Sequence, residues 1–352
     1  MNTRIAYLDF MRGLMVILVV VYHACCWGYW SDSQIAPIYH RVNPVLANVR
    51  MPILMLISGY LIRNISDKDR RTVISRIAQL AWLYALWMPV NLLAHIASDS
   101  ATFTIADLPA QIVLQWLNPT SEMWFIWALM ILTGLAYLLR EVPRYPVLVV
   151  LVLANGLTYQ FGWFQDQLAA TSMPRLGIFF FGGIMFHQEI KIFISSRFSV
   201  RMLAVLVAAA IGVHISETLI HEGLGIYAFQ GAESILVSIT VLYMCRMLAW
   251  VQPSTRFFTS VGRNTLPIYL AHVPVILMLR GTMPGEGVWL YVSPLLLATC
   301  GVGGGLLLHR LARGAGAGWL YSKPSWFNGR HAYRALDRVR ASLHMLAMPT
   351  GR

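Results

Sequence analysis

Three ionisable residues lie in the first apolar stretch of the sequence, residues 8–27 (LDFMRGLMVILVVVYHACCW): Asp9, Arg12 and His23. An ionisable side chain inside a bilayer costs at least about 2.5 kcal/mol, so each one predicts either a helix end at the headgroups or a polar cavity. Arg12 can reach the headgroups and pair with Asp9, whereas His23 lies too deep for that. A neutral imidazole accepts a proton near pH 7, so His23 is a candidate general base; a structural histidine with one hydrogen bond is the alternative.

The spacing of Arg12 and His23 strengthens this interpretation. They are eleven residues apart, close to three helical turns, so both lie on one face of a helix and about 16 Å apart along its axis. We expect Arg12 at the cytoplasmic boundary and His23 in the outer half of the membrane. The two side chains therefore cannot both touch one reacting carbonyl, and Arg12 has a helix-end anchor as its alternative role.

The elements that position these residues are predicted to be membrane helices. Of the 352 residues, 57% are hydrophobic and only 12% are charged. Apolar runs recur at about the length that crosses a bilayer core. The sequence therefore predicts an all-α polytopic membrane protein of about ten transmembrane helices. These segments span residues 7–30, 44–62, 77–96, 123–139, 145–163, 174–187, 202–220, 232–250, 264–280 and 288–308.

The positive charges predict the orientation of these helices. Cytoplasmic loops are enriched in Lys and Arg, and an N-terminus in the cytoplasm puts 23 of the 27 Lys and Arg residues on that side. Arg41, Arg50, Arg175 and Arg280 are left outside. We therefore expect both termini in the cytoplasm, in a multi-pass protein of the cell inner (plasma) membrane. The same topology accounts for the net charge of +12, so nucleic acid is not predicted as a partner.

The chain divides into two parts. Residues 1–313 form the predicted transmembrane domain, and residues 314–352 form a cytoplasmic tail whose basic and aromatic composition suits contact with anionic lipid headgroups. The connection 97–122 has no Lys or Arg, so we expect a partly structured cap on the outer side. The four cysteines lie in apolar segments without metal-ligand spacing, and no metal site is predicted.

Four motifs occur in order along residues 7–275. The first is YLDFMRGLMVILVVVYH (7–23), in which ten residues separate an Arg from a His. The others are RMPILMLISGYLI (50–62), MWFIWALMIL (123–132) and VGRNTLPIYLAHVPV (261–275). Together they resemble the acyltransferase-3 family of integral membrane acyltransferases, in its stand-alone form without a fused hydrolase-like domain.

The resemblance implies transfer of an acyl group, commonly acetyl from acetyl-CoA, to a hydroxyl, often on a sugar of an exported polysaccharide or surface glycan. It also implies that His23 and Arg12 are required. Acetyl-CoA, or another acyl-CoA, would be a donor substrate, with no bound cofactor. Direct proton abstraction by His23 and a transient acyl-histidine both remain open. The stretches ILMLIS and SEMWFIWAL depart from the Phe-rich and Glu-rich forms of other members, which bears on the acceptor more than on the reaction.

Several residues at the cytoplasmic side are candidates for supporting or donor-binding roles. Asp9 is expected to pair with Arg12. Arg71 and Arg76 would attract the phosphates of coenzyme A, or else only set topology. Ser58 and Tyr60 close the second predicted helix around Gly59, which permits close helix packing, and Tyr60 has an interfacial anchor as its alternative role.

Five residues are candidates for acceptor binding or for lining the cavity: Glu122, Trp124, Asn264, Tyr269 and His272. Glu122 and Trp124 lie at the outer boundary, where a carboxylate orients sugar hydroxyls and rings stack on sugars; an interfacial aromatic belt is the alternative. Asn264 is expected to cap the ninth segment. Tyr269 and His272 are i,i+3 neighbours expected to line one cavity, with a structural hydrogen bond as the alternative role of His272.

Two other function classes share these features. A secondary transporter is also a helix bundle with buried ionisable groups, but the sequence has no visible repeat and no matched pair of broken helices. A non-catalytic glycan flippase or export component would share both the cavity and the outer aromatic residues. Loss of acyl transfer in His23→Ala would support the enzyme over both.

Overall fold

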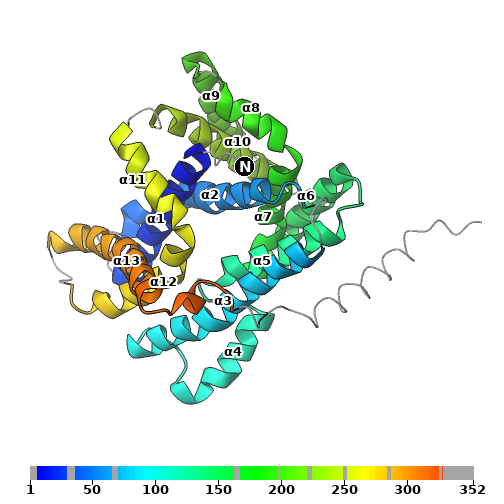
Figure 1. The fold of residues 1–352 in the computed structure, drawn as a ribbon. Helices are drawn as coiled ribbons and strands as arrows, with labels where there is room; N and C mark the ends of the chain where they lie inside the picture. Colours follow the sequence, from blue (N-terminus) through cyan, green and yellow to red (C-terminus); the bar gives the residue numbers. More distant parts are fainter. Residues whose placement is uncertain are drawn as a thin grey trace, which may run out of the picture.

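A computed structural model describes residues 6–29, 36–65, 70–161, 167–196, 198–219, 224–248, 252–283, 287–324 and 327. These residues form thirteen α-helices and two short 3-10 helices, and no strand occurs among them (Figure 1). The prediction of an all-α fold is therefore confirmed.

Each of the ten predicted apolar segments forms a helix. Their observed bounds are α1 (Ala6–Tyr29), α2 (Ala36–Leu61), α3 (Arg70–Ala97), α5 (Trp124–Leu138), α6 (Arg144–Gln160), α7 (Leu168–Met185), α9 (Val200–Leu219), α10 (Leu224–Leu248), α12 (Thr265–Arg280) and α13 (Trp289–Gly314).

Three further helices lie between the predicted segments. The first is α4 (Leu108–Leu117), which follows the 3-10 turn η1 (Ile105–Asp107) and gives the connection 97–122 the partial structure expected of it. The others are α8 (His187–Ser195) and α11 (Gln252–Arg263), for which no helix was predicted from the sequence. Helix α8 continues α7 through a bend of 75°, and α11 packs along α1.

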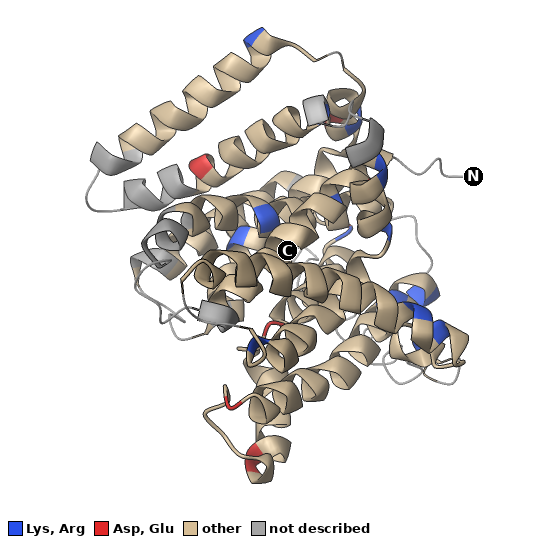
Figure 2. Ribbon diagram, turned by 90° about the vertical axis from the view of Figure 1, so that its left-hand side faces the viewer, with Lys and Arg blue, Asp and Glu red and all other residues tan. Residues whose placement is uncertain are grey.

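The length and apolar composition of each helix indicate whether it can cross a membrane. Among the described residues, α1, α3 and α13 are long and apolar enough to cross a bilayer, and α7 with α8 forms a bent fourth candidate. Three other apolar helices, α5, α6 and α12, have only 15, 17 and 16 residues, fewer than the roughly 20 of a full span. The polytopic membrane fold is confirmed, while the number of ten spans and the side of each terminus stay predictions. Figure 2 shows that long stretches of the helices carry no charged residue.

Helix α1 is the packing centre of the part of the bundle that holds the candidate site. It contacts α2, α11, α12 and α13. Its side chains Phe10, Met11, Met15 and Val16 are fully buried. A helix enclosed on most sides keeps its polar residues away from lipid, which is the arrangement expected for functional intramembrane groups.

Glycines at two helix crossings allow the helix backbones to touch. A β-carbon at Gly13 of α1 would overlap the Phe258 carbonyl oxygen of α11, and one at Gly262 of α11 would overlap the carbonyl oxygen of Asp9. Gly59 of α2 lies equally close to the Phe180 carbonyl of α7. Small residues at these crossings let the backbones approach. The glycines of the first, second and fourth motifs are therefore packing residues.

The start of the predicted tail packs on the bundle. After α13 ends at Gly314, the chain turns through η2 (Gly318–Leu320) and lies against α3. The indole nitrogens of Trp82 and Trp87 donate to the carbonyl oxygens of Trp319 and Leu320 at 2.8 and 2.7 Å. The expected contact of the tail with lipid headgroups concerns residues that mostly lie outside the described part of the chain.

Candidate active site

The histidine of the first motif and the histidine of the fourth motif touch each other. His23 Nδ1 of α1 lies 3.0 Å from His272 Nε2 of α12, and their ring centroids are 5.0 Å apart. His272 is 0% exposed, and His23 as a residue is partly buried. The contact places His23 against α12 inside the bundle.

Tyr269 and Glu122 join this pair. The Tyr269 ring lies 5.7 Å from the His272 ring, and its hydroxyl donates to the backbone carbonyl of Glu122. The Glu122 carboxylate lies 3.3 Å from His95 Nε2 of α3. Burial by itself would raise the pKa of Glu122. The hydrogen bond and the charge of His95 lower this pKa by more than burial raises it, so the pKa of the carboxyl lies below its usual value. His272, Tyr269, Glu122 and His95 thus form one polar cluster with His23, although all four are distant from it in sequence.

Arg50 is a site residue that the sequence analysis did not select. It lies within α2, only 5% exposed, with its guanidinium 4.2 Å above the ring of Tyr22 and 2.7 Å from the Asn43 side-chain oxygen. Arg50 and Glu122 both interact electrostatically with His23. Arg50 is the first residue of the second motif, and it is one of the few positive charges that the predicted topology leaves on the outer side. These two signals together could have identified it as a site residue. His95 was also missed, although it is an ionisable residue in an apolar segment.

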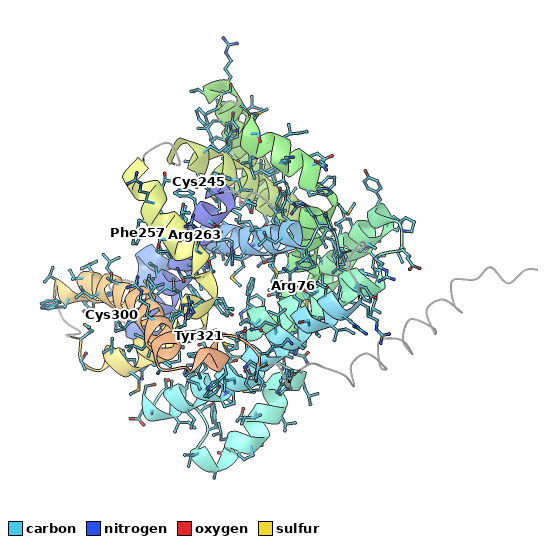
Figure 3. All side chains as sticks on the ribbon, viewed as in Figure 1. Arg76, Cys245, Phe257, Arg263, Cys300 and Tyr321 are labelled. Carbon is cyan, nitrogen blue, oxygen red and sulfur yellow. The ribbon has the colours of Figure 1, made fainter. Side chains whose placement is uncertain are left out.

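The other end of α1 holds a group of charges. Asp9 is buried, and its carboxylate lies 3.9 Å from Arg12 Nη1 and 3.7 Å from Arg263 Nε of α11. The expected pairing of Asp9 with Arg12 is therefore observed, and Arg263 of the fourth motif is an additional partner. Figure 3 shows Arg263 on α11, in a part of the molecule distinct from that of Arg76.

Asn264 lies at this second group and not beside His272. It precedes α12, but its side chain makes no capping bond there and donates instead to the Ser260 carbonyl of α11 at 2.9 Å. The expectation that it caps α12 is wrong, because α11 runs directly into α12 and supplies a nearer acceptor. Thr265 likewise bonds back to the Gly262 carbonyl at 2.7 Å.

Arg76 lines a polar cavity of about 530 Å³ between α2, α3, α5 and the C-terminal segment. Thr72, Gln79, Thr133 and Lys323 contribute to the same walls. Arg71 is exposed on the neighbouring turn of α3 and does not line this cavity. The candidate donor-binding residues thus fall into two groups, one at Asp9 and Arg12 and the other at Arg76.

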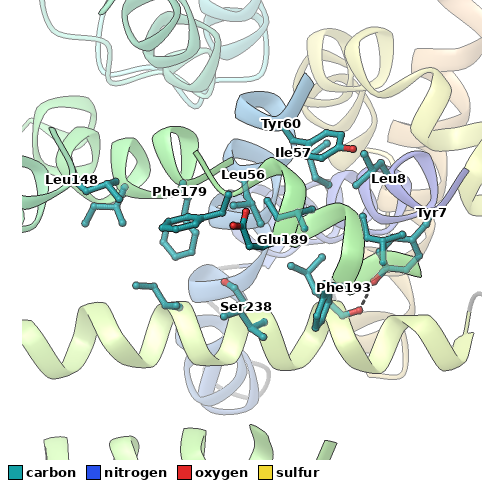
Figure 4. A pocket seen from close by; sticks show the side chains of 18 of the residues that line it. Tyr7, Leu8, Leu56, Ile57, Tyr60, Leu148, Phe179, Glu189, Phe193 and Ser238 are labelled. Carbon is teal, nitrogen blue, oxygen red and sulfur yellow. Dashed lines mark hydrogen bonds between the residues drawn. The ribbon is translucent and has the colours of Figure 1, made fainter. Parts of the chain in front are cut away.

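Ser58 and Tyr60 lie at the α2–α7 crossing. Ser58 Oγ donates to the Leu54 carbonyl at 2.7 Å, which is an internal helix bond. Tyr60 is 3% exposed and lines an apolar cavity of about 560 Å³ bounded by α1, α2, α6, α7, α8 and α10. Figure 4 shows Tyr60, Tyr7 and Glu189 around this cavity. Burial makes Tyr60 a packing residue of the bundle interior.

Trp124 begins α5 beside Glu122. It is partly buried, with its ring 6.4 Å from that of Phe125. Trp127 donates to the Trp116 carbonyl of α4 at 3.1 Å, so this aromatic pair holds the 97–122 connection onto the bundle. Among the described residues no group of three or more His, Cys, Asp or Glu side chains is arranged to hold a metal ion.

Known proteins match this chain over nearly its whole length. The acyltransferase-3 family, described as an acyltransferase domain, matches residues 5–309. The chain is 24% identical over 363 aligned residues to the inner membrane protein YcfT of Escherichia coli (strain K12), covering 92% of this chain and 98% of that protein. No solved structure matches. The apolar helical bundle is that of an inner-membrane protein. The chain belongs to the acyltransferase-3 family of membrane acyltransferases.

Proposed function

We propose that this protein is an O-acetyltransferase that moves acetyl from acetyl-CoA to a sugar hydroxyl of an exported polysaccharide or surface glycan, with His23 as the general base. One observation carries the proposal. In a chain that the acyltransferase family matches over residues 5–309, the histidines of the first and fourth motifs are in direct contact at 3.0 Å. An imidazole held by a buried one is suited to taking a proton from a hydroxyl.

The chemistry assigns a task to each neighbour of His23. The acceptor hydroxyl gives its proton to the imidazole while its oxygen attacks the thioester carbonyl. The tetrahedral intermediate then breaks its carbon–sulfur bond, and the leaving thiolate takes the proton from the imidazolium. Arg50 carries a fixed positive charge suited to the developing oxyanion, and the Glu122 carboxylate favours the transient imidazolium.

The charges at the other end of α1 support an anionic donor. Two guanidiniums, those of Arg12 and Arg263, lie 3.9 and 3.7 Å from the carboxylate of Asp9, so positive charge is concentrated at this end of the helix. Guanidinium groups bind phosphate strongly and with defined geometry. Coenzyme A has a flexible arm between its diphosphate and its thioester. A donor whose phosphates contact Arg12 would use that arm to cover the helix distance of about 16 Å to His23.

The orientation follows from the location of the substrates. Acetyl-CoA is a cytoplasmic metabolite, so the Arg12 end faces the cytoplasm, and Arg71 and Arg76 would add positive charge elsewhere on the same side of the membrane. The His23 end faces the outer half of the bilayer. A glycan reaching it from the membrane or the periplasm would meet Glu122, Trp124, Tyr269 and His272, whose carboxylate and rings suit sugar hydroxyls and faces.

The test uses purified full-length protein in lipid, radiolabelled acetyl-CoA and a panel of candidate surface glycans. We expect labelled ester on a glycan with the wild type and with His214→Ala, since His214 is an exposed histidine on α9 remote from the site. We expect none with His23→Ala. Transfer that persists in His23→Ala would refute the base, and glycan translocation without any transfer would favour the flippase. Analysis of ester-linked acetyl in surface glycans with and without the gene identifies the acceptor.

A further inference from the structure

The contact between His23 and His272 contains information about where their protons lie. A neutral imidazole has one N–H donor and one nitrogen with a lone pair, and the partners of each nitrogen decide which is which. The hydrogen-bond partners of the two rings therefore constrain which nitrogen of each carries the proton. The inference drawn from them rests on the proposed function, because it concerns the atom of His23 that acts as the base.

The protonated nitrogen of His272 can be assigned first. Its Nδ1 lies 2.7 Å from the Tyr269 carbonyl oxygen and 3.2 Å from the Ile268 carbonyl oxygen. Backbone carbonyls only accept hydrogen bonds, so Nδ1 of His272 must carry the proton. The side chain is 0% exposed and faces another imidazole, where a positive charge would be strongly unfavourable, so the ring is neutral. The Nε2 of His272 therefore carries a lone pair.

His23 follows from this assignment. Its Nδ1 lies 3.0 Å from the Nε2 lone pair of His272, so this nitrogen must be the donor. We infer that His272 is a positioning residue that holds His23 in the Nδ1–H tautomer and leaves His23 Nε2 as the atom that takes the acceptor proton. When Nε2 binds that proton, the bond from Nδ1–H to His272 Nε2 becomes charge-assisted and stabilises the imidazolium. The proton then leaves Nε2 for the departing thiolate.

The surrounding packing keeps His272 in this orientation. The hydroxyl of Tyr269, one turn earlier on α12, is tied to the Glu122 carbonyl. On the other side, Gly301 of α13 lies so close to α1 that an added β-carbon would overlap the side chain of Val20, and it would also contact the β-carbon of His272. A glycine there lets α13 press α12 against α1. The first and fourth motifs are therefore joined through one hydrogen bond whose direction is fixed by the α12 backbone.

The tautomer is measured directly by nitrogen NMR on full-length protein with 15N-labelled histidine in lipid nanodiscs, above neutral pH. The His23 signals are assigned by their disappearance in His23→Gln. We expect wild-type His23 to show a protonated Nδ1 and a bare Nε2. A wild-type spectrum with the proton on Nε2 overturns the inference, whether or not the protein transfers acetyl. The expected spectrum without any acyl transfer would instead overturn the proposed function alone.

Two substitutions of His272 separate positioning from packing. His272→Gln places an amide oxygen about as far along the side chain as Nε2, so it keeps an acceptor for His23. His272→Asn places its amide at the level of Nδ1 and cannot reach His23. We expect His272→Asn to move the His23 proton toward Nε2 and to lower kcat at least roughly tenfold with KM for acetyl-CoA unchanged, whereas His272→Gln retains the tautomer and most of kcat. Equal losses in both variants with an unchanged His23 tautomer would contradict the assignment.

Discussion

The two ends of α1 hold polar groups that are built differently. At the His23 end, two imidazoles contact each other inside the bundle, and the inferred tautomers give the hydrogen bond between them a single direction. At the Arg12 end, one buried carboxylate forms ion pairs of 3.7–3.9 Å with two guanidiniums that remain partly exposed. The first arrangement suits directed proton transfer, and the second suits electrostatic attraction of an anion.

The two ends of α1 should respond differently to substitutions and to salt. Hydrogen-bonded buried groups lose their function when one atom is misplaced, because no water replaces the missing partner. Partly exposed charges interact over longer distances and are screened by salt. Under the proposed function, the His23 end should therefore control kcat, and the Arg12 end should control KM for the donor.

The largest effect is expected at His23. His23→Gln removes the imidazole but retains polarity, and we expect kcat to fall by about 10²–10⁴, the usual contribution of a general base. KM for acetyl-CoA should stay within about twofold, because the donor phosphates lie about three turns of helix away. Initial rates over a range of acetyl-CoA concentrations give both constants. A rise in KM at unchanged kcat would show that the two ends are not separate.

Arg12 should give the next largest effect. In Arg12→Ala the donor loses a charge-assisted contact of about 1.5–3 kcal/mol, so KM for acetyl-CoA should rise roughly tenfold to a hundredfold, and activity at low donor concentration should be lost. Insertion into the membrane should be intact. Arg256→Ala is the matched control, since Arg256 is an exposed arginine of α11 on the helix that carries Arg263. Wild-type turnover in Arg12→Ala at low donor concentration would refute the assigned role.

The packing of α1 on α11 should give an intermediate effect. Gly262→Ala forces a β-carbon onto the Asp9 carbonyl, and we expect a loss of about 1–3 kcal/mol in the free energy of unfolding. Because Asp9 moves with that contact, KM for acetyl-CoA should rise more than kcat falls. Thermal unfolding in detergent is compared with Gly303→Ala, where an added β-carbon on α13 meets no atom within 4 Å. Equal stability of both variants would disprove the close crossing.

The smallest effect is expected at Arg76. It lines an open cavity and is exposed, and exposed charge pairs contribute about 0–1 kcal/mol, so Arg76→Gln should raise KM for acetyl-CoA by no more than about fivefold. This increase in KM should become smaller at higher salt, because salt ions screen the charge of Arg76 in the wild type, so that removing the charge matters less. Arg71→Gln should have a weaker effect still, since Arg71 does not line the cavity. An effect of Arg76→Gln on kcat alone would contradict a role in donor attraction.

The apolar pattern of the sequence predicted the helices well. Ten apolar runs became ten helices, because a run of about twenty apolar residues has few other stable conformations in a membrane. The amphipathic α11 and the short α8 were missed, since their stability depends on packing against α1 and α7 and their apolar residues are too few to form a run.

Residue types and their spacing along one helix were enough to predict the helical class, the membrane environment and most of the candidate site residues. Asp9 with Arg12, and Arg12 with His23, needed only the geometry of α1. Only the tertiary structure brought His23 to His272, which lies 249 positions away, and Arg263 to Asp9. It also moved Asn264 away from the histidines and placed Arg50 beside Tyr22. These contacts arise between helices, where glycine crossings and side-chain packing set the approach, and no periodicity within one segment encodes them.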